Sequence, residues 1–258
     1  MPPDADLYLF VEVHAARGLV EPLVAANLRP LLERSEQAFV SARLGTARPP
    51  AAELALTGRF SPELVSLRLG SSCSWLRVES RPTYWRSRSE PLEVCSPEKG
   101  LLLAAMGEPA GMERLLARRQ SYGRQVPGSG LPGYDEPGVA EFVKGAGIYA
   151  LLPSLAATEG VPVRGLWLAA FPQPDGLEVN ALFQLAEQGN LRGLQNLVRL
   201  LLVSVLRKAG LPDLVSRLKT VEVAVEGASV TVRGLTLSAR EVQALLEPLL
   251  EPRLGVSK

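Results

Sequence analysis

Residues 220–233 read TVEVAVEGASVTVR, and apolar and polar side chains alternate on both sides of Gly227-Ala228. Alternation with a period of two is typical of a half-buried strand, and a two-residue connection that contains glycine is typical of a tight hairpin. Ser238 and Glu241 follow with the spacing of a capping box, which predicts a helix from Ser238 to about Leu250. We therefore expect two antiparallel strands and a helix at the end of the chain.

A long helix is predicted before this hairpin, at Asn190–Ala209. Asn190 is a suitable N-cap, and Gly210 and Pro212 end the helical pattern. The same half contains two strands joined by a turn-forming run, and it opens with a segment that fits either a helix or a strand. These segments are Val163–Phe171, Leu177–Leu185 and Val139–Leu155.

The first half of the chain mixes strands and helices in the same way. Leu7–Val13 alternates, which predicts a strand with an aliphatic core face made of Leu7, Leu9, Val11 and Val13. From Gly18 to about Leu44 the apolar spacing is helical, which predicts a long helix. A meander of short strands is expected next, and then a short helix at Pro109–Arg119. The strands are Leu54–Phe60, Leu64–Leu69, Cys73–Val78, Leu92–Cys95 and Leu101–Ala105.

Residues 126–138 are rich in Gly and Pro, which predicts a connector. It would join an N-terminal subdomain, residues 1–125, to a C-terminal subdomain, residues 139–258. The expected fold class is α+β, with antiparallel sheets covered by helices in two subdomains of similar size. Gly128–Gly133 matches a dinucleotide-binding loop in its letters only. No strand precedes it and Pro132 stands where a helix should begin, so no cofactor is expected.

Composition limits the activities that the chain can have. Hydrophobic residues make up 47% and charged residues 21%, which is typical of a folded chain with a packed core. A net charge of +1 excludes a globally basic nucleic-acid binder. The chain has two cysteines and a single histidine, His14, so no metal site is expected. With no recognisable nucleophile motif or cluster of polar residues, we expect no enzymatic activity.

The two cysteines, Cys73 and Cys95, leave two interpretations open. If Cys73–Val78 pairs with Leu92–Cys95 in a hairpin, the two thiols face each other across the strands at nearly the spacing of a disulfide. An oxidised pair would indicate export. Two buried, reduced thiols fit the sequence equally well.

The segment from Trp75 to Arg88 mixes aromatic side chains with guanidinium groups. A hairpin with alternating exposed charges explains this pattern more simply than single-stranded nucleic-acid binding, because glutamates dilute the positive charge. An edge that binds a protein partner is the functional alternative. Its candidate residues are Trp75, Tyr84, Trp85, Arg86 and Arg88.

The predicted helix at Asn190–Ala209 is unusually apolar and cationic. Its apolar side chains span an arc of about 200°, roughly twice the stripe that a surface helix needs. Residues 190–219 carry six basic and one acidic side chain in a chain whose net charge is only +1. Such a helix can lie in a membrane interface or line a lipid pocket, although a central helix covered on both sides would look the same. The candidate binding residues are Leu194, Leu197, Val198, Leu201, Leu202, Val205, Arg192, Arg199 and Arg207.

Two resemblances point to the bacterial cell envelope. The opening Pro2–Val13, with its Tyr8-Leu9-Phe10-Val11-Glu12-Val13 strand, resembles a loose group of uncharacterised bacterial envelope proteins, as does the closing hairpin and helix. These proteins are generally exported, some as lipoproteins. The amphipathic helices are similar to those of spirochaetal outer-membrane-associated proteins that bind lipid. The resemblance implies an exported protein with a lipid or membrane partner and no known catalytic residues.

Met1–Asp6 lacks the basic region and the apolar run of a secretory signal. Either the start is that of a cytoplasmic protein or an export signal has been removed from an envelope protein. No stretch approaches the 18 apolar residues of a membrane-spanning helix. We therefore predict a non-catalytic envelope protein that binds lipid, another apolar ligand or a membrane surface. A protein-interaction module is the alternative.

Overall fold

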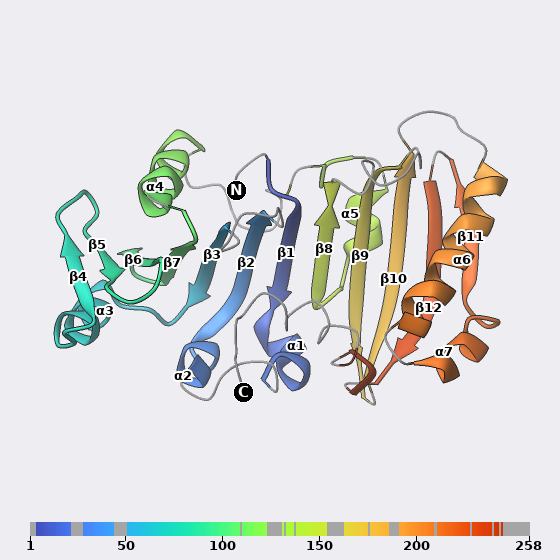
Figure 1. Cartoon of the computed structure of the whole chain (residues 1–258), viewed down its shortest axis with the longest axis horizontal. Helices are drawn as coiled ribbons and strands as arrows, with labels where there is room; N and C mark the ends of the chain where they lie inside the picture. Colours follow the sequence, from blue (N-terminus) through green and yellow to red (C-terminus); the bar gives the residue numbers. More distant parts are fainter. Residues whose placement is uncertain are drawn as a thin grey trace. The chain divides into compact units, whose positions relative to one another are not determined.

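The computed structural model divides into two compact units, residues 1–136 and residues 137–258. Each combines an antiparallel sheet with helices, as an α+β protein does (Figure 1). Residues 126–130, 132 and 137 of the predicted connector at 126–138 lie outside the described residues, and the role of the connector stays a prediction. The structure describes residues 4–21, 28–43, 51–108, 110–122, 131, 133–136, 138–153, 163–174, 176–185, 191–208, 211–227, 229–238, 240–242 and 244.

In the first unit the strands form the order β1-β2-β3-β7-β6-β5-β4, with antiparallel pairs. The strands are β1 Leu7–Glu12, β2 Ser35–Arg43, β3 Ala51–Gly58, β4 Trp75–Val78, β5 Tyr84–Ser87, β6 Leu92–Glu98 and β7 Leu101–Met106. The helices are α1 Val13–Val20, α2 Arg29–Leu32, α3 Pro62–Gly70 and α4 Gly111–Tyr122.

Two helices cover opposite faces of this sheet. On one face, Met112 and Leu116 of α4 pack against Tyr84, Cys95 and Leu103. On the other face, Val65 of α3 packs against a cluster made of Leu56, Phe60 and Leu102. Because neighbouring residues of a strand point to opposite faces, Leu102 and Leu103 belong to different cores. This part of the unit is therefore a helix–sheet–helix sandwich.

The first strand and the helix after it differ from the sequence-based expectation. β1 ends at Glu12, and Val13 and His14 already belong to α1, where His14 is exposed. Val11 and Val13 of the predicted aliphatic face are buried, but they are not alone in the core. Tyr8 and Phe10, on the other face, are buried, because β2 brings Phe39 to 4.9 Å from Phe10 between ring centroids.

Two predictions in this unit were wrong. The long helix expected at Gly18–Leu44 is in fact α1, α2 and the strand β2, which is bonded to a neighbour on each side. The segment Leu64–Leu69 lies in α3, where the Ser61 side chain accepts a hydrogen bond from the Leu64 N–H and Pro62 occupies the first turn. The strand β5 is absent from the five predicted meander strands, although it lies within the predicted Trp75–Arg88 hairpin. Capping and strand pairing outweighed the apolar pattern at each place.

In the second unit the strands form the order β8-β9-β10-β12-β11, again antiparallel. The strands are β8 Ile148–Leu152, β9 Val163–Gln173, β10 Gly176–Leu185, β11 Glu222–Glu226 and β12 Ser229–Leu237. The helices are α5 Val139–Val143, α6 Leu191–Lys208 and α7 Pro212–Arg217. The hairpin predicted at residues 220–233 is β11 and β12, and the long helix predicted before it is α6.

The capping box at Ser238 is present as predicted. The Ser238 N–H donates to the Glu241 carboxylate at 2.7 Å, and the Glu241 N–H donates to Ser238 Oγ at 3.3 Å. These two reciprocal bonds satisfy backbone groups that a helix start otherwise leaves unpaired. Residues 245–258 lie outside the described residues, so the predicted end of this helix stays a prediction.

Candidate functional site

One side of α6 is fixed to the sheet of the second unit, over β11 and β12 (Figure 1). Val198 and Leu206 are fully buried in a cluster with Val223 and Val230. Gln195 Nε2 donates a hydrogen bond to the Val223 carbonyl oxygen at 2.5 Å. This side of the helix is therefore part of the core.

The opposite side of α6 faces solvent. At 100° per residue, five of its exposed residues lie within about 80° of one another, on the far side from Val198 and Leu206. Leu200 is the large apolar residue among them, and it is 67% exposed. Arg199 is also exposed, but it lies about 20° from Leu206 around the helix and so outside this arc. Neither Arg199 nor Arg207 forms an ion pair with another described residue. The outward residues are Gly193, Asn196, Leu200, Ser204 and Arg207.

The structure places the predicted α6 residues in different environments. Val198 is an anchor in the core rather than a surface contact. Leu197 and Leu202 are half-buried against the same cluster, whereas Arg199 and Arg207 are exposed. The side chains of Leu194, Leu201, Val205 and Arg192 lie outside the described part of the chain. Which of these residues contacts a ligand stays a prediction.

Leu200 was missing from the predicted set, although it is the most exposed leucine that the structure describes on α6. A helical wheel places it among polar neighbours and opposite the Val198–Leu206 side. That position could have separated Leu200 from the buried arc. A broad apolar arc on its own does not show which edge is covered.

β4 and β5 form the predicted hairpin, but its aromatic residues do not form a surface. Tyr84 is 0% and Trp85 is 8% exposed, and Trp75 is half-buried. The two residues of β5 instead pack against opposite faces of the sheet, because the pleat directs neighbours apart. Arg86 and Arg88 remain exposed, and partner binding through them stays a prediction.

The strand order also changes the expected geometry of the cysteines. Cys73–Val78 does not pair with Leu92–Cys95, because β5 lies between β4 and β6. Cys73 is an exposed free thiol and Cys95 is a buried one. Burial raises the pKa of the Cys95 thiol to about 11. The thiol donates a hydrogen bond to the Thr83 carbonyl oxygen at 3.4 Å.

The two thiols are expected to react very differently in the folded protein. At pH 8 a maleimide should modify Cys73 within minutes and leave Cys95 unmodified, because the thiolate is the reactive form and Cys95 is both protonated and enclosed. Mass spectrometry of the intact protein should show one adduct in buffer and two in urea. Two adducts in buffer, at similar rates, would contradict this placement of Cys95.

A row of cross-strand neighbours lies beneath α4 and is largely polar. The row consists of Ser41 on β2, Glu53 on β3, Ala105 on β7, Glu93 on β6 and Arg86 on β5. Glu53 forms an ion pair with Arg118 of α4. The helix is therefore held by charged contacts as well as by Met112 and Leu116. No local pattern in the sequence marks this row, because its members are contributed by five strands.

Glu93 joins the sheet to the start of α4. Its side chain is 6% exposed, Oε2 accepts the Met112 N–H at 2.8 Å, and Oε1 accepts Arg86 Nε–H at 2.8 Å. Nearby, the Tyr84 hydroxyl donates to Glu113 at 3.1 Å. Burial, and then this bond to Glu113, raise the pKa of Tyr84. A carboxylate is the favoured partner for the unpaired N–H groups at a helix N-terminus.

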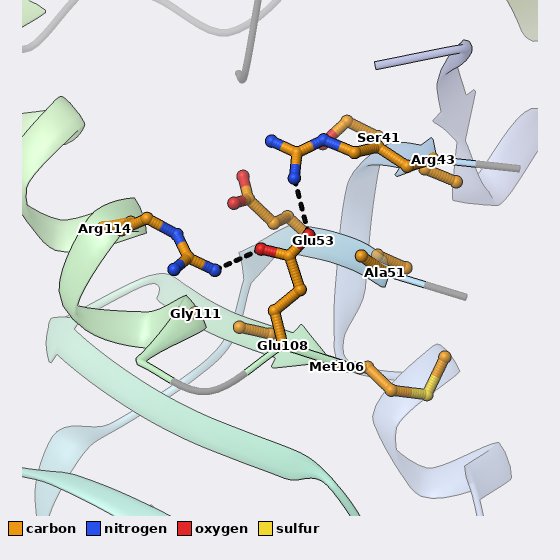
Figure 2. Close-up of a pocket in the computed structure, with 11 residues that line it drawn as sticks. Ser41, Arg43, Ala51, Glu53, Met106, Glu108, Gly111 and Arg114 are labelled. Atoms are coloured by element: carbon orange, nitrogen blue, oxygen red, sulfur yellow. Dashed lines mark hydrogen bonds and ion pairs between the residues drawn. The ribbon is translucent and has the colours of Figure 1, made fainter. Parts of the chain in front are cut away.

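A small cavity of about 20 Å³ lies beside the first turn of α4, between β2, β3 and β7 (Figure 2). At its mouth Glu108 accepts a hydrogen bond from Arg43 at 2.5 Å and pairs with Arg114. Arg43 also donates to Asp4 at 2.9 Å. The hydrogen bond between them raises the pKa of Arg43 and lowers that of Asp4. The charges at the mouth therefore compensate one another.

Within the described ranges, no three His, Cys, Asp or Glu side chains gather closely enough to hold a metal ion. The cavity is too small for an organic substrate. The outward side of α6 combines the exposed apolar residue Leu200 with the cation Arg207, and it is a candidate surface for a larger partner.

Comparison with known proteins gives a match in structure but none in sequence. No protein-family model matches the chain, and no curated protein matches it by sequence. The fold matches that of TP0453. This is a protein of the spirochaete Treponema, and its crystal form III superposes with a TM-score of 0.66 and 16% identity over 95% of this chain and 94% of that chain.

Two other crystal forms of TP0453 give the same result. Form I has a TM-score of 0.64 at 17% identity and covers 95% of this chain and 94% of that chain. Form IV has a TM-score of 0.62 at 16% identity and covers 94% and 92%. At this identity the match to TP0453 establishes a shared fold. It supports the weaker, spirochaetal resemblance found in the sequence.

Proposed function

We propose that the protein is a non-catalytic component of the bacterial envelope that binds lipid, another apolar ligand or a membrane surface through the outward side of α6. The observation that carries this proposal is Leu200, which is 67% exposed on a helix fixed from behind by Val198 and Leu206. An apolar side chain among cations can enter the acyl boundary while arginines contact anionic headgroups. Arg207 lies about 20° from Leu200 around the helix, which supports this role for its guanidinium group, and Arg199 is exposed at the border with the buried side.

The fold is consistent with such a role. It is shared with TP0453, and the sequence resembles spirochaetal outer-membrane-associated proteins. No described helix is long and apolar enough to cross a bilayer. In the proposed arrangement α6 lies parallel to the membrane surface, with its inner side still packed on the sheet.

Replacing Leu200 with aspartate should lower binding to vesicles of phosphatidylglycerol and phosphatidylethanolamine by about tenfold or more. Moving a leucine side chain from water into the apolar part of the membrane contributes about 1.5–3 kcal/mol to the free energy of binding. The new carboxylate is also repelled by anionic lipid. Vesicle flotation of the purified protein measures this. Replacing Arg199 and Arg207 together with glutamine should lower binding as well, and added salt should have the same effect.

Leu67→Asp is the matched control, because Leu67 lies on α3 in the other unit and is 69% exposed. Neither substitution fills or empties a core, so both variants should keep the unfolding midpoint of the parent. If Leu67→Asp abolishes flotation and Leu200→Asp does not, the α6 proposal is wrong. If the parent protein neither floats with vesicles nor carries lipid detectable by mass spectrometry after mild purification, the proposed function is wrong.

A further inference from the structure

The cavity beside α4 is surrounded by buried polar atoms that have no protein partner. Among the described residues, four buried side-chain atoms form no hydrogen bond: Ser41 Oγ, Arg43 Nε, Glu53 Oε2 and Arg118 Nε. Ser41, Arg43 and Glu53 line the cavity, and Arg118 is the ion-pair partner of Glu53. Ser41 is only 1% exposed. Buried polar atoms are nearly always bonded, so four unpaired atoms at one place indicate a shared partner.

The space exists because the surrounding residues are small. Glu53 is followed across the sheet by Ala105, and an added Cβ at Gly111 would lie 3.0 Å from the Ala105 Cβ. Ala51 and Ala52 form the wall on β3. The resulting volume, about 20 Å³, exceeds the roughly 10–15 Å³ that one water molecule needs. It is too small for a guest of several heavy atoms.

The chemistry of the lining defines the guest. Arg43 Nε–H can only donate, Glu53 Oε2 can only accept, and the Ser41 hydroxyl can do both. The guest must therefore accept and donate hydrogen bonds at once. Arg43 and Arg114 are compensated by Glu108 and Asp4, and Arg118 by Glu53, so the surroundings favour a neutral guest. A water molecule fits the volume of the cavity, can both donate and accept hydrogen bonds, and is neutral.

We propose that this cavity is a hydration site, in which an ordered water molecule bridges Ser41 Oγ, Glu53 Oε2 and Arg43 Nε and helps to hold α4 on the sheet. The bridge links β2 and β3 within the polar row beneath the helix. It completes the polar contacts that the pairs Arg118–Glu53 and Arg114–Glu108 begin.

The direction in which Ser41→Ala shifts the urea midpoint of unfolding tests the proposal. Ser41→Ala should lower the urea midpoint of unfolding, because the bridging water loses a partner. In a dry cavity the same change removes an unpaired buried hydroxyl and should raise the midpoint. Ser35→Ala is the control, since Ser35 lies on the same strand, is equally buried, and donates to the Leu31 carbonyl oxygen at 2.8 Å. Its midpoint should fall. A midpoint raised by Ser41→Ala overturns the proposal.

Crystallography gives a second readout that does not depend on stability. A map at about 1.5 Å should show a water peak within about 3.2 Å of Ser41 Oγ and Glu53 Oε2. Ser41→Val should remove the peak, because the added methyl groups occupy its place. A parent map without density at this position overturns the proposal.

Discussion

Replacing Glu93 with alanine is expected to lower the free energy of unfolding by about 3 kcal/mol, because this carboxylate is buried between two donors. The Met112 N–H at the start of α4 loses its acceptor, and Arg86 loses its partner. Arg86 is half-exposed and can be solvated, so the expected loss lies at the lower end of the range for broken buried pairs. Glu93→Gln should lose less, since its amide oxygen can still accept one bond.

Urea unfolding and hydrogen exchange measure this effect. Amide exchange should rise first in α4, because Glu93 on strand β6 accepts the Met112 N–H at the start of that helix. Glu90→Ala is the control, since Glu90 is exposed just before β6, and it should change the free energy by no more than about 0.5 kcal/mol. An unchanged unfolding midpoint for Glu93→Ala would show that the bonds from Glu93 to Met112 and Arg86 contribute nothing to stability.

Replacing Gly176 with alanine is expected to destabilise the second unit by about 3 kcal/mol or more, which combines a forced backbone conformation with a steric clash. Its φ is +159°, and an added Cβ would lie 2.2 Å from the Leu237 carbonyl oxygen. Because that oxygen belongs to the paired strand β12, β10 and β12 would have to separate at this end.

Gly234→Ala separates the two causes. Gly234 also has a positive φ, +82°, but nothing lies within 4 Å of an added Cβ. Its substitution should therefore cost only the conformational part, about 1 kcal/mol. Thermal unfolding of the two variants compares them directly. Equal losses would mean that the close approach between Gly176 and Leu237 contributes nothing.

The local signals in the sequence were sufficient for some elements. The hairpin of β11 and β12, the capping box at Ser238 and the helix α6 rest on contacts between residues close in the chain, so their patterns could be read directly. The Leu64–Leu69 segment carried a local signal too, the Ser61 cap and Pro62, but its apolar residues outweighed that signal in the prediction.

Other elements depend on partners far away in the sequence. The stretch Ser35–Arg43 becomes β2 because β1 and β3 bond to both of its edges, whatever its helical spacing suggests. The same holds for the candidate sites. Leu200 and Val198 are similar residues two positions apart, and only the sheet beneath α6 decides which is covered.

The sequence by itself determined the α+β class, the terminal hairpin and an apolar, cationic helix before it, because period, caps and turns are local properties. Only the tertiary structure decided that Tyr84 and Trp85 lie in the core, that β5 separates the two cysteines, and that Ser41, Glu53 and Glu93 line up beneath α4. The physical reason is that strand order and register bring residues from five separate strands together, and no nearby stretch of sequence records either.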